Sequence, residues 1–137
     1  MLKKDKHWAR ILITPKTILV VEDEVSLNNL YVKFLETEGY IVESAKNGQE
    51  ALEIFNARKP DLILLDLSMP VLDGVGFLKE ANILEASPNT RVIVFTNSED
   101  DDRIDKAFDL GATRYLLKVM LAPKELSRIL HGELNGK

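Results

Sequence analysis

Cysteine is absent from the sequence, and histidine occurs only as His7 and His131. A chain without cysteine forms neither a disulfide framework nor a thiolate metal site, and two isolated histidines do not suit a zinc site. We therefore interpret both histidines as surface residues. A hard cation bound by carboxylate oxygens is the kind of metal site that remains open.

A long apolar run is also lacking near the N-terminus. Lys3, Lys4 and Lys6 are followed by Ile11–Ile13, a run far too short for a signal peptide or a membrane span. We therefore expect a cytoplasmic protein.

Excess positive charge is confined to one segment. The whole chain carries a net charge of −4, whereas residues 1–16 hold five basic side chains and one acid, which leaves −8 for the remainder. An acidic remainder argues against a nucleic-acid-binding surface spread over the protein. We expect residues 1–16 to be a basic, flexible leader, with docking of Trp8 and Ile11–Ile13 on the domain or on a partner as the alternative.

The length of 137 residues suits one compact domain and is too short for two. A regular pattern begins at Thr17, so we predict a domain over residues 17–134 and a tail over residues 135–137. We expect no output domain, because the leader is too short to fold alone and few residues follow the last predicted helix.

Five apolar, β-rich runs alternate with stretches of helical spacing, and the second run is weak and edge-like. The predicted strands are Ile18–Val21, Tyr40–Val42, Leu62–Leu65, Val92–Phe95 and Tyr115–Leu117. The predicted helical faces comprise Leu27, Leu30, Phe34 and Leu35; Ala51, Leu52 and Phe55; Ile104, Ala107 and Phe108; and Leu126, Ile129 and Leu130. Gly39 and Gly111 mark helix ends, and Pro123 marks the start of the last helix. Such alternation predicts a doubly wound α/β sandwich around a parallel sheet.

Charged or hydroxyl side chains follow four of the five runs. They are Glu22 and Asp23 after the first run, Asp66 after the third, Thr96 after the fourth and Lys118 after the fifth. Ligands of open parallel sheets bind at the carboxyl ends of the strands, so we expect these side chains to converge. Three close carboxylates repel one another unless a cation joins them, and Mg²⁺ suits carboxylates combined with phosphate oxygens.

This combination indicates phosphoryl transfer, in which catalysis consists mostly of positioning and charge neutralisation. A carboxylate can act as the nucleophile. Asp66 is the best candidate, because it ends the most hydrophobic strand and precedes a loop, residues 67–74, that contains turn residues.

These residues resemble the receiver domain of two-component response regulators, over about residues 17–134. The matching segments are VVEDE at Val20–Glu24, LLDLSMPVLDG at Leu64–Gly74, Thr96 and Lys118. The spacings of 30 residues from Asp66 to Thr96 and 22 from Thr96 to Lys118 also fit such receivers. The resemblance implies a flavodoxin-like (βα)5 sandwich with strand order 2-1-3-4-5, of the stand-alone, chemotaxis-regulator type.

The resemblance also implies roles for the acidic residues. Glu22 and Asp23 would be the acidic pair that binds Mg²⁺. Asp66 would be both the phosphoacceptor and a metal ligand, and the backbone carbonyl of Ser68 would complete the protein ligands.

Further roles carried over from the family concern the conformational switch that follows phosphorylation. Thr96 would hydrogen-bond the phosphoryl group and Lys118 would pair with it, while Tyr115 would turn inward as Thr96 moves. Ser68 and Ser98 occupy positions that modulate the phosphoryl lifetime in this family.

By the same resemblance, the chain would be a phosphoprotein of a two-component phosphorelay. A histidine kinase or a histidine phosphotransfer protein would phosphorylate Asp66, and the chain would hydrolyse its own acyl phosphate without a separate effector activity. The signal would leave through the fourth helix, fifth strand and fifth helix to a downstream protein or a phosphorylation-dependent dimer. We expect neither direct nucleic-acid binding nor membrane insertion.

One departure from the family follows Lys118, where receivers usually have proline and this chain has Val119. A cis bond before Val119 would cost about 2.5 to 4 kcal/mol, which leaves its geometry open. The apolar segment Val119–Leu121 either packs on a partner or closes the core.

Taken singly, the site residues have structural alternatives. Asp23, Asp66 and Thr96 could cap helices, Lys118 could be a solvated strand end, and Tyr115 could simply pack in the core. Independent caps, however, give no reason for this order of residue types at strand ends.

Two functional alternatives stand beside the switch. The first is a phosphorylation-independent, receiver-like interaction scaffold from a larger sensor or regulator. The second is a hydrolase with an aspartyl nucleophile, which would need a further acid soon after Asp66, where Leu67–Ser68 offers none.

Overall fold

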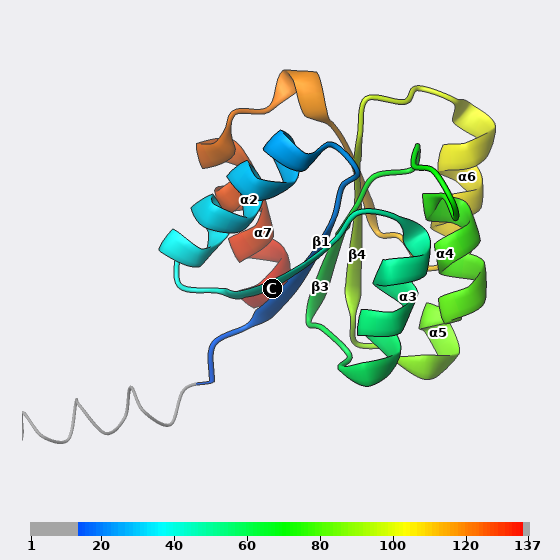
Figure 1. The fold of residues 1–137 in the computed structure, drawn as a ribbon, viewed down its shortest axis with the longest axis horizontal. Coiled ribbons are helices and arrows are strands. Elements are labelled where there is room, and N and C mark those ends of the chain that lie inside the picture. The colour runs from blue at the N-terminus through cyan, green and yellow to red at the C-terminus, as the bar shows by residue number, and fades with distance from the viewer. Residues whose placement is uncertain (1–13, 136–137) are drawn as a thin grey trace, which may run out of the picture.

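A parallel five-stranded sheet lies between two layers of helices in the computed structural model, which describes residues 14–135 (Figure 1). The strands are β1 (Thr17–Val21), β2 (Ile41–Ala45), β3 (Leu62–Leu65), β4 (Arg91–Thr96) and β5 (Arg114–Leu117). The helices are α2 (Val25–Thr37), α3 (Gly48–Ala57), α4 (Gly74–Ala81), α5 (Ile83–Ala86), α6 (Asp101–Asp109), the 3₁₀ turn η1 (Lys118–Met120) and α7 (Pro123–Asn135). The order β2-β1-β3-β4-β5 confirms the predicted doubly wound sheet with order 2-1-3-4-5.

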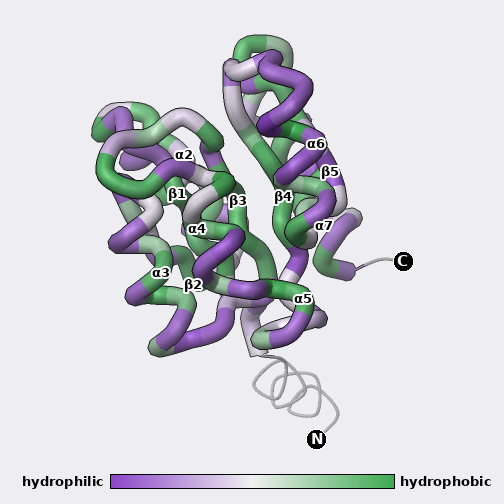
Figure 2. Tube along the Cα trace, turned by 90° about the vertical axis from the view of Figure 1, so that its right-hand side faces the viewer, coloured by the Kyte–Doolittle hydropathy of each residue, from purple (hydrophilic) through white to green (hydrophobic). Residues whose placement is uncertain are grey.

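The strands alternate their side chains between two separate cores. Ile18 and Val20 of β1 lie in the core under α2 and α7, whereas Leu19 and Val21 lie in the core under the other helices. Figure 2 shows the apolar strands in the interior of the molecule. A strand that is buried on both faces must be apolar at every position, which explains the unbroken runs in β1, β3 and β4.

Helix boundaries follow local chemistry. Gly39 and Gly111 have φ of +102° and +121°, the left-handed region that suits glycine beyond a helix end, as predicted. The side chains of Asn47 and Asp73 accept hydrogen bonds from the first turns of α3 and α4. Pro123 begins α7, as its fixed φ favours.

Two residues of the predicted helical faces do not face the core. Leu30 and Phe108 are 50% and 40% exposed, so these predictions are wrong. On α2 the buried ridge runs instead through Asn28, Tyr31 and Leu35, at spacings of three and four residues, and Leu30 lies to one side of it.

Two further elements differ from the prediction in position. The sequence pattern assigned no helical face between β3 and β4, where the chain forms α4 and the short α5. Strand β2 begins near the predicted place but extends to Ala45, because it pairs with all of β1 along one sheet edge.

The leader predicted for residues 1–16, with His7, Trp8 and Ile11–Ile13, lies outside the described residues apart from positions 14–16. The same holds for the tail after Asn135. The boundaries of the 17–134 domain therefore stay a prediction. Along residues 14–135, every helix is too short or too polar to cross a bilayer.

Candidate functional site

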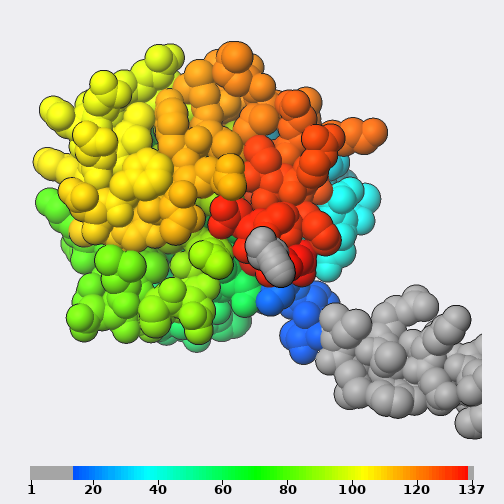
Figure 3. Space-filling model, turned by 180° about the vertical axis from the view of Figure 1, so that it is seen from behind, coloured from blue at the N-terminus to red at the C-terminus, as the bar shows by residue number. Residues whose placement is uncertain are grey.

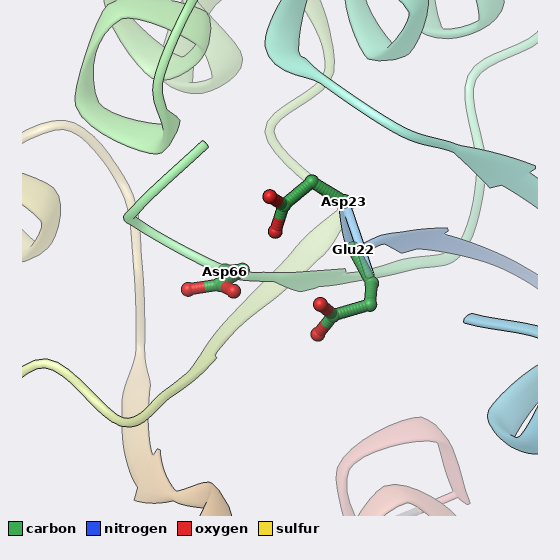
Figure 4. Close-up of side chains that lie close together, drawn as sticks. All are labelled: Glu22, Asp23 and Asp66. Atoms are coloured by element: carbon green, nitrogen blue, oxygen red, sulfur yellow. The ribbon is translucent and has the colours of Figure 1, made fainter. Parts of the chain in front are cut away.

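The predicted strand ends converge at the carboxyl edge of the sheet. Val21, Leu65 and Val94 occupy one register across β1, β3 and β4, and Thr96 pairs with Leu117 of β5. The residues that follow these strands therefore enter one pocket. Figure 4 shows the side chains of Glu22, Asp23 and Asp66 gathered there.

The three carboxylates form a single acidic cluster. One oxygen of each of Glu22, Asp23 and Asp66 lies within 4.8 Å of the others, and residues 14–135 hold no second such group of potential metal ligands. Glu22 and Asp66 are buried, while Asp23 is exposed at the mouth. A donor set made only of oxygens and open on one side fits Mg²⁺, which keeps part of its water shell.

Lys118 closes the inner side of the pocket. Its ammonium donates to Oδ2 of Asp66 at 2.8 Å and also contacts Oε1 of Glu22. Burial by itself lowers the pKa of Lys118, but the hydrogen bonds and charges of the two carboxylates outweigh it and hold the pKa above 10.5. Lys118 is therefore a fixed cation in the pocket.

The second oxygen of Asp66 is held by two other donors. The hydroxyl of Thr96 donates to Oδ1 at 2.7 Å, and the backbone amide of Ser68 donates to the same oxygen at 3.1 Å. The amide of Ser98 in turn lies 3.2 Å from the Thr96 hydroxyl. The structure thus brings together all the residues that the sequence analysis placed at the acceptor carboxylate.

Tyr115 lies beside the loop that connects Thr96 with α6. Its ring is partly buried against the core, and its hydroxyl donates to the backbone carbonyl of Ser98 at 2.9 Å. Packing and a specific hydrogen bond are therefore both present. The hydrogen bond connects β5 with the loop that precedes α6.

The bond between Lys118 and Val119 is trans, which answers the question left open by the missing proline. Unlike proline, Val119 carries an N–H, and the side-chain carbonyl of Asn97 accepts it at 3.0 Å. Val119 and Met120 are each 72% exposed, whereas Leu121 packs against the core. Of the apolar segment Val119–Leu121, only Leu121 therefore serves to close the core.

Supporting residues escaped the sequence analysis. Asn28 is buried on the sheet-facing side of α2 and donates to the carbonyls of Glu22 and Ala45 at 2.9 and 3.1 Å. The sequence signal that could have identified Asn28 is a polar residue at a buried position of the helix. Arg103, the one cation directly after the acidic run Glu99–Asp102, contacts the loop after Asp66.

The loop itself admits little variation. A Cβ on Gly74 would lie 2.6 Å from the Asp66 carbonyl and 2.8 Å from the Leu67 Cα, so only glycine fits. The Gly74 amide donates to the Leu67 carbonyl at 3.1 Å. The backbone after Asp66 is therefore folded closely back on itself.

Fold and pocket together define a doubly wound α/β domain with an acidic, lysine-closed pocket at the carboxyl edge of its sheet. The chain belongs to the response regulator receiver domain family, whose model matches residues 18–131. This confirms the resemblance seen in the sequence motifs.

Several curated proteins are similar to the chain. The chemotaxis protein CheY of Halobacterium salinarum is 32% identical over 114 residues, which cover 83% of this chain and 93% of that protein. The sporulation initiation phosphotransferase F of Bacillus subtilis is 36% identical over 101 residues, covering 74% and 80%. The probable transcriptional regulator ycf27 of Porphyridium aerugineum is 42% identical over 118 residues, covering 85% of this chain and 47% of that protein. The chain thus spans about half the length of such regulators.

Solved structures give the same result. A CheY-like receiver domain from Methanospirillum hungatei JF-1 matches with a TM-score of 0.82 and 27% identity, covering 89% of this chain and 95% of that one. The response regulator TrrA of Thermotoga maritima, in complex with Mg²⁺-BeF, matches with a TM-score of 0.74 and 32% identity, covering 87% and 99%.

Proposed function

We propose that the chain is a switch that accepts a phosphoryl group on Asp66, with Mg²⁺ as cofactor. The environment of this carboxylate is the observation that carries the proposal. Thr96 and Lys118 donate to its two oxygens at 2.7 and 2.8 Å, and two more carboxylates lie within 4.8 Å. One lysine leaves excess negative charge in this pocket, which a divalent cation would offset.

The metal would be held by Glu22, Asp23, Asp66 and the backbone carbonyl of Ser68. Bound there, Mg²⁺ supplies neutralisation of the charge on the phosphoryl oxygens. Lys118 already holds one carboxylate oxygen of Asp66. The other oxygen accepts from two neutral donors, the Thr96 hydroxyl and the Ser68 N–H, which would also be available to a phosphoryl group on this carboxylate.

The donor would be a phosphohistidine of a histidine kinase or of a phosphotransfer protein. An oxygen of Asp66 attacks the phosphorus, a P–O bond forms, and the P–N bond breaks as the imidazole leaves and gains a proton from water. In a separate hydrolysis step, water attacks the phosphorus, the P–O bond to Asp66 breaks, and inorganic phosphate and the free carboxylate are released. Self-dephosphorylation would thus need no further enzyme.

The response would pass through Thr96 and Tyr115. A phosphoryl group adds about 1.5 to 2 negative charges and strong acceptors, which attract the Thr96 hydroxyl. The Ser98 carbonyl, bonded to Tyr115, would carry this shift toward α6. Figure 3 shows α6, β5 and α7 side by side on one face, and Phe108, Val119 and Met120 are exposed residues of α6 and η1.

This face would bind a downstream protein or a second copy of the chain once Asp66 is phosphorylated. We place this activity in the cytoplasm, without direct contact to nucleic acid. The names of the chemotaxis and phosphotransferase relatives, and the Mg²⁺-BeF complex of TrrA, support a phosphoryl switch. A phosphorylation-independent scaffold is the alternative.

Intact-protein mass spectrometry distinguishes the phosphoryl switch from the phosphorylation-independent scaffold. Wild type, Asp66→Asn and, as a matched control, Asp61→Asn would be incubated with Mg²⁺ and a small phosphodonor, with and without a chelator. We expect one phosphoryl adduct on wild type and on Asp61→Asn, and none on Asp66→Asn or with chelator. No adduct on wild type under any condition would favour the scaffold.

A further inference from the structure

Arg103 connects α6 to the loop that follows Asp66. One guanidinium nitrogen, Nη1, donates to the Ser68 hydroxyl at 3.1 Å, and the other, Nη2, donates to the Leu67 carbonyl and lies 3.5 Å from Oδ2 of Asp73. The side chain is partly buried. Arginine is suited to this place because its rigid fork reaches two acceptors at once.

The Leu67 carbonyl belongs to the same peptide unit as the Ser68 amide. A peptide unit is planar, and in its trans form the C=O and the N–H point in opposite directions. Arg103 and the Gly74 amide hold the carbonyl on one side. The amide on the other side must then point toward Asp66, and it donates to Oδ1 at 3.1 Å.

We propose that Arg103 is a positioning residue for the phosphoryl chemistry, because it fixes the Leu67–Ser68 peptide with the Ser68 N–H directed at the acceptor. The inference rests on the proposed function of Asp66 and deepens it. A donor fixed in advance stabilises developing charge without reorganisation at the moment of reaction. Since Arg103 belongs to α6, the same contact ties the position of this helix to the pocket.

Two readouts test the inference on the full chain. The first is the ¹⁵N–¹H resonance and hydrogen exchange of the Ser68 amide in the unmodified protein. The second is the affinity for beryllofluoride with Mg²⁺, a stable mimic of the phosphoryl group. The variants are Arg103→Ala, Arg103→Lys and, as control, Arg114→Ala, which removes the arginine of the Arg114–Glu133 pair at the opposite end of β5.

We expect the Ser68 amide of Arg103→Ala to change its resonance position and to exchange its hydrogen faster than in wild type. We also expect this variant to bind beryllofluoride about tenfold more weakly. Deleting an oxyanion donor outright costs about 10²-fold, so the loss is smaller than that. Arg103→Lys should lie between, since lysine keeps the positive charge but lacks the rigid planar fork of arginine. Guanidinium ion should restore part of the affinity of Arg103→Ala, which a merely structural defect would not allow. Arg114→Ala should match wild type.

The inference would be overturned if the resonance and hydrogen exchange of the Ser68 amide were the same in Arg103→Ala as in wild type. It would also be overturned if Arg114→Ala lost as much beryllofluoride affinity as Arg103→Ala. If wild type binds no beryllofluoride, the proposed function fails. In that case the resonance and hydrogen exchange of the Ser68 amide still show whether Arg103 orients the Leu67–Ser68 peptide. The two failures are therefore distinguishable.

Discussion

The hydroxyl of Thr96 lies 2.7 Å from Oδ1 of Asp66, although thirty residues separate them in the sequence. Both side chains are buried, and Thr96 is the last residue of β4, beside the end of β3. Lys118 engages the other oxygen of Asp66 at 2.8 Å. Donors thus engage both oxygens of the Asp66 carboxylate, and a phosphoryl group on Asp66 would compete for them.

Loss of the Thr96 hydroxyl should destabilise the fold. Thr96→Val keeps the shape but leaves a buried carboxylate oxygen with one donor fewer, so we expect the free energy of unfolding to fall by about 1 to 3 kcal/mol. Thr96→Ser retains the hydroxyl and should lose less. Urea unfolding monitored by circular dichroism measures both. Equal stability of Thr96→Val and wild type would show that this hydrogen bond contributes nothing.

Mg²⁺ should stabilise the protein against unfolding, because it offsets the charge of the acidic cluster only in the folded state. A concentration ten times the dissociation constant should add about 1.4 kcal/mol to the free energy of unfolding. Asp23→Asn should remove most of this gain. Glu24→Gln removes an exposed charge next to the cluster and should keep the gain. Thermal unfolding with and without Mg²⁺ makes the comparison, and equal gains in the two variants would contradict the assignment of Asp23.

Val71 stores backbone strain in the loop after Asp66. Its φ is +71°, the Leu72 amide donates to the Pro70 carbonyl across it at 2.8 Å, and its side chain is 81% exposed. A β-branched residue at positive φ within a γ-turn is strained and gains little here from packing. We expect Val71→Gly to raise the free energy of unfolding by about 1 kcal/mol, measured by urea unfolding.

Val71→Ile is the matched control, since isoleucine is also β-branched and keeps the strain. It should be as stable as wild type. A Val71→Gly variant that is less stable than both would mean that the loop gains more from the valine than its backbone conformation costs.

Alkaline pH should weaken the fold through Tyr31. Its ring packs edge-to-face on Phe95 with centroids 5.2 Å apart, and burial raises its pKa above 10.0, against the opposing effect of the Lys118 charge. A folded-state pKa above the unfolded value stabilises the fold fully below that unfolded value, about 10, and the contribution is lost as the pH rises through the folded pKa.

Tyr31→Phe keeps the packing and removes the titration, so its free energy of unfolding should fall less between pH 9 and 11 than that of wild type, in the range about the ordinary tyrosine pKa. Urea unfolding across this pH range measures the difference. Identical pH dependence of the two proteins would assign the alkaline loss to other groups.

The fold and the convergence of Asp66, Thr96 and Lys118 were predictable because their signals are strong in the sequence. Strands buried on both faces give unbroken apolar runs, and the sheet itself places the residues after these runs at one edge. That is why Asp66, Thr96 and Lys118 were found although 30 and 22 residues separate them. The proximity of these three residues could be predicted without knowing the conformation of any loop.

The supporting contacts were not predictable in the same way. Arg103, Asn97 and Asn28 act through side chains that cross between loops and helices, and no periodicity marks such contacts. Leu30 and Phe108 fit a helical spacing but lie just outside the buried ridge, since an apolar residue at the margin of a helical face is compatible with either side.

Reductive trapping of the modified residue tests the central claim most directly. Borohydride reduces an aspartyl phosphate to homoserine with release of phosphate, and peptide mass spectrometry then locates the converted position. After treatment with Mg²⁺ and a small phosphodonor, we predict homoserine at position 66 of the wild-type chain and at no other carboxylate. Homoserine at a different carboxylate, or none with an adduct still present, would contradict the assignment of Asp66 as the phosphoacceptor.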